Sequence, residues 1–275
     1  MADQPDFDTQ AFRDFEQAGW QDLGQSYHAV TRDSTRHAAE HLLDAVDAGP
    51  GKRLLDIACG PGYSAGLAAE RGAAAEGIDF AASMVAEAGR TYPAAQFREG
   101  DAEDLPFDDA SFDAAVCAFG MLHFARPEQA AAEAHRVLKP GGRFAFTVWC
   151  TPDRVETFKI FRGAVEAHGT MDVPLPAGPP MFRFSDPAAC HGLLAGAGFG
   201  GIEVGEITIT RRTTPEKLVE GLAGATVRTR ALIEAQTPDA RAKIYAEILQ
   251  RGKAMAKDEV LTLSMPAVLA SARRN

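Results

Sequence analysis

The sequence has few cysteines and lacks the long apolar run of a membrane span. Only four cysteines occur among its 275 residues, Cys59, Cys117, Cys150 and Cys190, and no two of them form a Cys-x-x-Cys pair. This spacing disfavours a disulfide framework, a zinc site and a thioredoxin-type motif. The first residues, Met-Ala-Asp-Gln-Pro-Asp, also lack the basic start and apolar stretch of a secretory signal. We therefore expect a cytoplasmic protein with no membrane span and no bound metal.

Positive charge is also scarce. The 28 lysines and arginines are outnumbered by 38 aspartates and glutamates, which gives a formal net charge of −10. Affinity for nucleic acids and anionic membranes depends on lysine and arginine neutralising phosphate, so this balance argues against both classes of partner. Hydrophobic residues make up 46% of the chain. That share is ordinary for a globular protein and excludes a disordered or collagen-like chain.

The hydrophobic pattern changes along the chain. Residues 8–48 carry apolar side chains spaced by threes and fours, which predicts helix up to Gly49-Pro50-Gly51. Between 53 and 149, five short apolar runs, starting near 53, 75, 96, 112 and 143, are separated by helical segments. Strands that alternate with helices indicate right-handed βαβ units, and hence a doubly wound α/β fold with a mostly parallel sheet.

The last part of the chain is less regular. We expect strands at 202–210 and near 260–270, with two helices between them. Thr214-Pro-Glu and Thr237-Pro-Asp each combine a capping threonine, a first-turn proline and an acid. The apolar faces of these helices either line a substrate pocket or pack on the sheet; they contain Leu218, Leu222, Ala225, Ile244, Tyr245, Ile248 and Leu249. The expected organisation is 1–50 helical, 51–150 an α/β core, and 151–275 the rest of the sheet with a helical segment at about 213–257.

Residues that suit ligand binding follow the predicted strands. Gly60 and Gly62 follow the first strand, Asp79 ends the second, Asp101 follows the third, and 117–120 follow the fourth. In parallel sheets, ligands bind at this carboxyl edge. The pattern Gly60-x-Gly62-x-x-Ala, with Asp79 about 20 residues on, also fits a dinucleotide fingerprint. Spacing alone therefore leaves a nicotinamide-dependent oxidoreductase possible.

The acidic residues at this edge favour a cationic adenosine ligand. Asp79 can accept hydrogen bonds from ribose hydroxyls. Asp101, beside Ala102, can accept from an adenine amine. A ligand with a positive charge and no phosphate would also tolerate Asp56 in the first strand. S-adenosylmethionine has these features: adenine, ribose, an ammonium, a carboxylate and a sulfonium.

Five ordered segments carry a family resemblance, spread over about 50–150. They are 54–62 (LLDIACGPG), 77–84 (GIDFAASM), 100–107 (GDAEDLPF), 111–120 (SFDAAVCAFG) and 136–143 (RVLKPGGR). With these segments the chain resembles the class I S-adenosylmethionine-dependent methyltransferases. Within that family it is similar to the branch of ubiquinone and menaquinone biosynthesis enzymes and small-molecule methyltransferases.

The resemblance implies a seven-stranded Rossmann-like sheet, S-adenosylmethionine as cofactor and S-adenosylhomocysteine as product. It implies that 1–50, with Trp20 and Tyr27, form a lid. We expect the helical segment at about 213–257 to cap the substrate, because the amino-terminal helices and 150–260 are the parts of the chain left to cover the mouth of the site. The implied cofactor contacts are Asp56, Ala58, Gly60 and Gly62 at the methionine end, Asp79 at the ribose, Phe80 and Met84 at an adenine face, Asp101 and Ala102 at the adenine edge, and Cys117, Ala118 and Phe119 at the floor, with Tyr27 from the lid. Ala58 departs from the glycine of many members, and Phe80 and Met84 could instead be helix-packing residues.

The expected reaction is in-line transfer of a methyl group to oxygen, carbon or nitrogen of a small, largely apolar acceptor. His123, just beyond the fourth strand, is the candidate general base, with a structural histidine as the alternative. Three other functions stay open: a nicotinamide-dependent oxidoreductase, a cofactor-binding protein without methyl transfer, and an enzyme of this fold with another reaction, such as a cyclisation. The acceptor and the oligomeric state also stay open.

Overall fold

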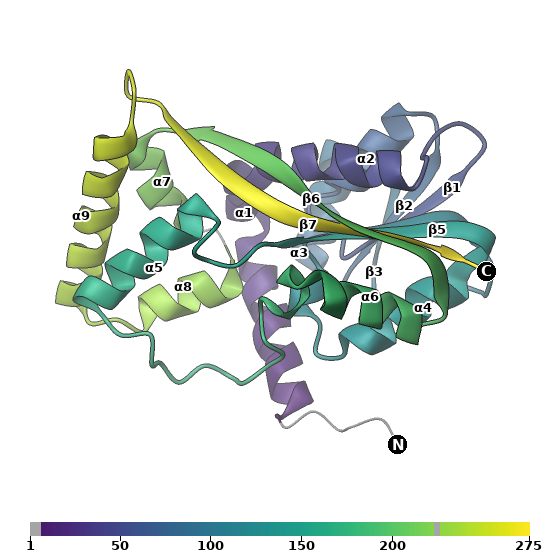
Figure 1. The fold of residues 1–275 in the computed structure, drawn as a ribbon, viewed down its shortest axis with the longest axis horizontal. Helices are drawn as coiled ribbons and strands as arrows, with labels where there is room; N and C mark the ends of the chain where they lie inside the picture. The colour runs from purple at the N-terminus through teal and green to yellow at the C-terminus, as the bar shows by residue number, and fades with distance from the viewer. Residues whose placement is uncertain (1–6, 223–225) are drawn as a thin grey trace.

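A mixed seven-stranded sheet organises the protein (Figure 1). The computed structural model describes residues 7–222 and 226–275. The strand order is β3-β2-β1-β4-β5-β7-β6, and β7 is antiparallel to both of its neighbours whereas the other pairs are parallel. The strands are β1 (Arg53–Ile57), β2 (Ala74–Asp79), β3 (Gln96–Glu99), β4 (Phe112–Ala118), β5 (Leu138–Trp149), β6 (Phe199–Thr213) and β7 (Leu261–Arg274). The predicted doubly wound, mostly parallel sheet is confirmed.

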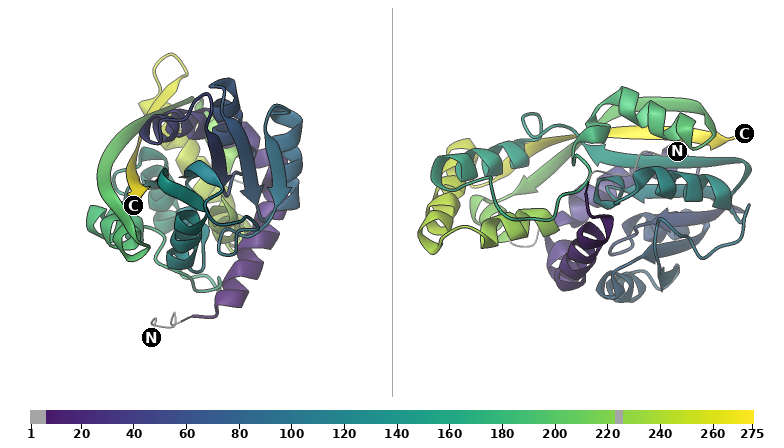
Figure 2. Two further views of the ribbon diagram at one scale, coloured as in Figure 1. Left: turned by 90° about the vertical axis from the view of Figure 1, so that its right-hand side faces the viewer. Right: turned by 90° about the horizontal axis from the view of Figure 1, so that it is seen from below.

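Helices cover both faces of the sheet (Figure 2). The connecting helices are α2 (Tyr63–Glu70), α3 (Ala82–Thr91), α4 (Pro127–Val137) and α6 (Pro187–Gly196), with 3₁₀ turns η1 (Met121–His123) and η2 (Arg183–Ser185). Successive strand residues point to opposite faces. In β1, Leu54 joins a core cluster with α2, whereas Leu55 and Ile57 join a cluster with α4 and α6. The short apolar run of β1 is therefore buried on both faces.

The first helix, α1 (Thr9–Ala45), is a single helix of 37 residues, about 55 Å long at 1.5 Å per residue. Asp8 caps it by accepting hydrogen bonds from the backbone N–H groups of Gln10 and Ala11, both at 3.0 Å. Its C-terminal part packs on the sheet through Leu42 and Leu43. Its N-terminal part instead crosses the carboxyl edge of the sheet, where Trp20 packs beside Met84 of α3.

A helical lobe extends from the far end of β6 and β7 (left in Figure 1). It contains α5 (Glu156–His168), α7 (Pro215–Leu222), α8 (Val227–Glu234) and α9 (Pro238–Met255), of which α7, α8 and α9 connect β6 to β7. The structure thus has three helices where the sequence predicted two. The missed helix, α8, begins at a capping Thr226 whose hydroxyl accepts from the N–H of Thr229 at 3.2 Å.

The lobe has its own hydrophobic core. Leu218, Leu222, Ile244 and Ile248 pack there with α5 and the start of β7, and each is at most 4% exposed. The interpretation of these four side chains as the lining of a substrate pocket is therefore wrong, because their apolar surface is already buried within the lobe. Ala225 lies outside the described residues. Tyr245 packs against the same core and is partly buried.

The described residues contain neither a membrane-spanning helix nor a disulfide bond. Within residues 7–222 and 226–275, no helix combines the length and the apolarity that a membrane crossing requires. All four cysteines are unpaired and buried.

Candidate functional site

The site is built on the sharp turn between β1 and α2. Ala58, Gly60 and Gly62 all have left-handed backbone conformations, with φ of 53°, 50° and 83°. At Gly62 a Cβ atom would lie 2.8 Å from Phe97 and 2.9 Å from Ala88, so only glycine fits there. Ala58 adopts the left-handed conformation despite its Cβ, at a cost of about 1–2 kcal/mol. The turn keeps the backbone of Gly60 close to the end of β2.

Asp79, the last residue of β2, fastens this turn. Its Oδ2 accepts a hydrogen bond from the N–H of Gly60 at 2.8 Å, and its Oδ1 accepts from the N–H of Ala81 at 3.0 Å. The side chain is buried, and burial raises the pKa of Asp79 to about 6. Each carboxylate oxygen can accept a second hydrogen bond. Asp79 therefore has acceptor capacity left for a ligand.

Asp56 lies beneath the same turn. Its Oδ2 accepts from the N–H of Ala65 at 2.9 Å, while its buried Oδ1 has no hydrogen-bond partner among the described residues. Burial, together with the nearby charge of Asp79, raises the pKa of Asp56 to about 7. No lysine or arginine of the described chain pairs with either carboxylate. The site thus contains two buried acids that no lysine or arginine of the described chain neutralises, although the charge of a protonated His123 would lower the pKa of Asp79 in part.

A cavity opens beside these acids at the carboxyl edge of the sheet. Eleven of the predicted site residues line it: Tyr27, Ala58, Gly60, Asp79, Phe80, Met84, Asp101, Ala102, Ala118, Phe119 and His123. Asp56, beneath the glycine turn, and Gly62, at its end, do not line the cavity. Cys117 is fully buried among core residues, where burial raises the pKa of its thiol, so the prediction that it forms part of the floor is wrong. Its neighbours Ala118 and Phe119 remain in the lining.

One face of α1 covers this cavity. Arg13, Trp20 and Tyr27 line it, and Glu16 lies on the same face. These residues are spaced by three, four and seven positions, which places them along one stripe of a helix. Sequence reasoning recognised Trp20 and Tyr27 but missed Arg13 and Glu16, although this helical spacing would have indicated them.

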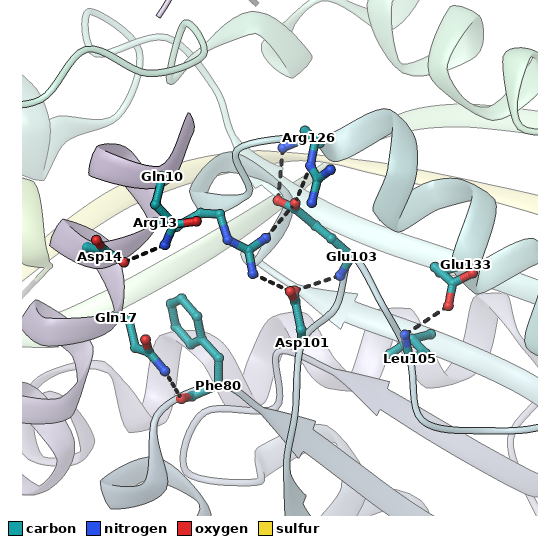
Figure 3. Close-up of polar contacts among 10 residues, drawn as sticks. All are labelled: Gln10, Arg13, Asp14, Gln17, Phe80, Asp101, Glu103, Leu105, Arg126 and Glu133. Carbon is teal, nitrogen blue, oxygen red and sulfur yellow. Dashed lines mark hydrogen bonds and ion pairs between the residues drawn. The ribbon is translucent and has the colours of Figure 1, made fainter. Parts of the chain in front are cut away.

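Arg13 links α1 to the loop after β3 (Figure 3). Its guanidinium pairs with the carboxylate of Asp101 and, at 2.6 Å, with Oε2 of Glu103. Arg126 approaches the same Oε2 at 2.9 Å, and Asp101 Oδ1 accepts from the backbone N–H of Glu103 at 2.8 Å. The Asp101 carboxylate, predicted at the adenine edge, is therefore already held by Arg13 and by a backbone amide.

A second polar contact joins α1 to the chain after β4. Oε2 of the fully buried Glu16 lies 3.0 Å from Nδ1 of His123 and accepts from the indole N–H of Trp20 at 3.1 Å. The rings of Trp20 and His123 meet edge to face, with centroids 5.0 Å apart. When the Glu16 carboxylate accepts from Nδ1–H, the neutral imidazole keeps Nε2 as a hydrogen-bond acceptor. This arrangement can support a general base at the cavity wall.

Comparison with known sequences identifies the core of the chain. A family model described as "Methyltransferase domain" matches residues 55–146. The chain is 40% identical over 128 residues to the demethylmenaquinone methyltransferase of Renibacterium salmoninarum, a match that covers 46% of this chain and 52% of that protein. The chain spans about half the length of the curated relatives it matches.

Two solved structures resemble the whole fold. A phosphoethanolamine N-methyltransferase 2 from Haemonchus contortus, in complex with phosphomonomethylethanolamine and S-adenosylhomocysteine, has a TM-score of 0.56 at 19% identity and covers 96% of this chain and 60% of its own. The [4+2]-cyclase SpnF has a TM-score of 0.52 at 20% identity, with 92% and 96% covered. At these identities the likeness shows a shared fold.

Replacing Asp56 by asparagine tests whether its charge is uncompensated. In the folded protein the pKa is raised to about 7, from a usual value of about 3.9. The stability contributed by the protonated form is present at low pH and lost as the pH rises through 7. Asp56→Asn should therefore melt above wild type at pH 8, by about 2–4 °C per kcal/mol gained, and the gap should narrow towards pH 5. Calorimetry of the ligand-free protein measures this.

Asp113→Asn is the matched control of opposite sign. Burial raises the pKa of Asp113, but the 2.8 Å ion pair with Lys139 and the hydrogen bond from the N–H of Arg53 together outweigh burial and leave that pKa lowered. This variant should lose stability at pH 8, and the loss should vanish at low pH. If Asp56→Asn melted below wild type at pH 8 in the same manner, the charge of Asp56 would be compensated in the fold.

Proposed function

Because residues 55–146 form a class I S-adenosylmethionine-dependent methyltransferase domain, we propose that the protein transfers a methyl group from S-adenosylmethionine to a small-molecule acceptor. The product would be S-adenosylhomocysteine. The buried carboxylates of Asp56 and Asp79, beside the glycine turn and without a lysine or arginine partner in the described chain, carry this proposal. Buried charges are costly unless paired. The positive charge of this cofactor, held at the turn, would offset the negative charge of both acids through space.

Asp56 argues against the main alternative, whereas Asp79 occupies the ribose-binding position of either cofactor. A nicotinamide dinucleotide would place a pyrophosphate at the glycine turn, next to the buried carboxylate of Asp56. Like charges so close in a buried site repel strongly. An oxidoreductase is therefore disfavoured by the electrostatics of the turn, although its spacing fits.

We assign the cofactor contacts by position in the cavity. Asp79 would accept from the ribose hydroxyls, and the turn containing Ala58 and Gly60 would hold the methionine end, with Asp56 and Gly62 supporting it from behind. Phe80 and Met84 would pack on the adenine. Asp101 would reach the adenine amine through the lone pairs that Arg13 leaves free.

The acceptor would enter beside the aromatic part of the same cavity. Trp20, Phe119 and Phe124 line it and suit a largely apolar molecule; they replace the helical lobe as the support for an apolar acceptor. The four buried, unpaired cysteines support a reducing cytoplasm as the setting.

His123 is our candidate for the general base, with Glu16 as its positioning residue. When bound, S-adenosylmethionine supplies a methyl group that its sulfonium already activates, so alignment of the reactants can provide much of the acceleration. A base is needed only for an acceptor that arrives protonated. The Glu16 carboxylate would fix the imidazole tautomer in which Nε2 accepts that proton.

Turnover is tested directly by mass spectrometry. The protein is incubated with S-adenosylmethionine and a small-molecule extract of its own cells, and products heavier by one CH₂ unit are sought. Their appearance, with formation of S-adenosylhomocysteine, would identify the acceptor. Cofactor binding without any methylated product would favour a binding protein or another reaction, such as the cyclisation for which SpnF is named.

S-adenosylmethionine and S-adenosylhomocysteine should both raise the melting temperature, whereas NAD and NADP should not. A ligand that binds only the folded state stabilises it by about 2.7 kcal/mol at 100 times its dissociation constant. Thermal shift measurements over a ligand titration check this. A shift with the nicotinamide cofactors alone would overturn the methyltransferase proposal.

Asp79→Ala should weaken cofactor binding by about one to three decades, because two charge-assisted hydrogen bonds are lost. The same change also frees the N–H groups of Gly60 and Ala81, so a loosened turn must be separated from a lost contact. Calorimetry with S-adenosylhomocysteine and its 2′-deoxy analogue does this as a double-mutant cycle. Deleting the hydroxyl should cost affinity in the wild type and little in the variant. An equal cost in both proteins would remove Asp79 from the ribose site.

His123→Gln should lower kcat by at least about tenfold with a hydroxyl acceptor, since general-base assistance is typically worth about 10²–10⁴. Cofactor affinity should stay unchanged. Glu16→Gln should shift the pH dependence of kcat, which a merely structural residue would not do. Near-normal turnover of His123→Gln with a lowered melting temperature would instead make this histidine structural.

A further inference from the structure

A second, larger cavity lies against α1. Its volume is about 960 Å³, it is open to solvent, and it is bordered by α1, the carboxyl end of β6, the first turns of α7 and the approach to β7. None of the described residues lines both cavities: Tyr27 faces the cofactor cavity, and the next residue, His28, lines this one. The second cavity is therefore a separate space in the fold.

The lining of this cavity is rich in basic side chains. Arg32 of α1, Arg211 and Arg212 of β6, and Lys217 of α7 all contribute to it. None of these four side chains forms an ion pair with a carboxylate within residues 7–222 and 226–275. Two acids, Asp33 and Glu220, also line the cavity, so basic groups predominate there. A local excess of positive charge is unusual in a chain whose formal net charge is −10.

Arg211 is the central group of this cluster. It is partly buried, and its guanidinium lies beside Gly221 of α7, which also faces Val30 of α1. A Cβ added to Gly221 would lie 3.2 Å from Nη2 of Arg211 and 3.1 Å from Val30. Burial lowers the pKa of Arg211, and no neighbouring carboxylate counteracts that effect. A guanidinium withdrawn from water without an anionic partner is unfavourable, because its desolvation is not compensated.

We propose that this cavity binds a small anionic molecule through phosphate or carboxylate groups. The guanidinium of Arg211 would hold one such group with two parallel N–H···O hydrogen bonds, the geometry that arginine favours for these anions. Arg32, Arg212 and Lys217 would add positive charge around it. Asp33 and Glu220 would repel negative groups that lie far from Arg211. The cavity would therefore favour a compact ligand whose negative groups are close together. The site does not depend on methyl transfer, since it shares no lining residue with the cofactor cavity.

Isothermal titration calorimetry with pyrophosphate and with citrate, in sodium chloride of matched ionic strength, tests the proposal. The wild-type chain should bind at least one of the two saturably, and a preference between them separates a phosphate ligand from a carboxylate ligand. Arg211→Gln should weaken this binding at least tenfold. Arg273→Gln is the control, because Arg273 is an exposed strand arginine at the end of β7 that lies away from the cavity. The affinity of this variant for the anion should stay within twofold of wild type.

Stability gives an independent readout. Without anion, Arg211→Gln should melt at or above the wild-type temperature, because it removes an unpaired, partly buried charge. The double variant Arg32→Gln/Lys217→Gln keeps Arg211 and should also bind more weakly than wild type. Lack of saturable binding of either anion by the wild type would overturn the proposal. So would equal binding by wild type and Arg211→Gln.

Discussion

The hydrogen bond from the backbone of Gly60 to the carboxylate of Asp79 links the two loops on which the candidate site depends. It joins the turn after β1 to the end of β2, and the same carboxylate also holds the N–H of Ala81 at the start of α3. The arrangement works because the turn takes a left-handed backbone, which brings amides rather than side chains towards the acid. This arrangement has a cost, because it buries the charged carboxylate of Asp79 close to that of Asp56. Both acids have raised pKa values, so each contributes stability that is lost as the pH rises, and together they favour a cationic ligand over a neutral one.

The long first helix combines two tasks that separate segments could have performed. Leu42 and Leu43 fix its C-terminal part in the core of the sheet, whereas Arg13 and Glu16 connect its N-terminal part to loops after β3 and β4. The cover of the cavity is thus a continuation of the core. His28, at the middle of this helix, lies 3.1 Å from the hydroxyl of Tyr63 in α2, so the helix touches the glycine turn region, both cavities and the sheet.

How much could be predicted from sequence depended on whether the information was local. The strands, the glycines after the first strand and Asp79 at the end of the second could be predicted, because short segments of sequence carry the pattern that identifies them. Glu16 and His123 are 107 positions apart: helical periodicity identifies the face on which Glu16 lies, but not what that face meets. Leu218 and Ile244 illustrate the same problem, because an amphipathic helix has the same pattern whether it covers a pocket or packs on another helix. Cys117 lies in the core, whereas the next residue, Ala118, lines the cavity, and the sequence pattern does not resolve a difference of one position.

The position of β7 has a consequence for how the protein acquires its structure during synthesis. β7 lies between β5 and β6 and pairs with both, yet it follows β6 by the whole of α7, α8 and α9. During synthesis, β5 and β6 therefore lack the strand that lies between them until residues 261–274 have left the ribosome. Unpaired strand edges and long-range pairing slow folding and expose a nascent chain to aggregation. The sheet of this protein can therefore be completed only after β7 has been synthesised.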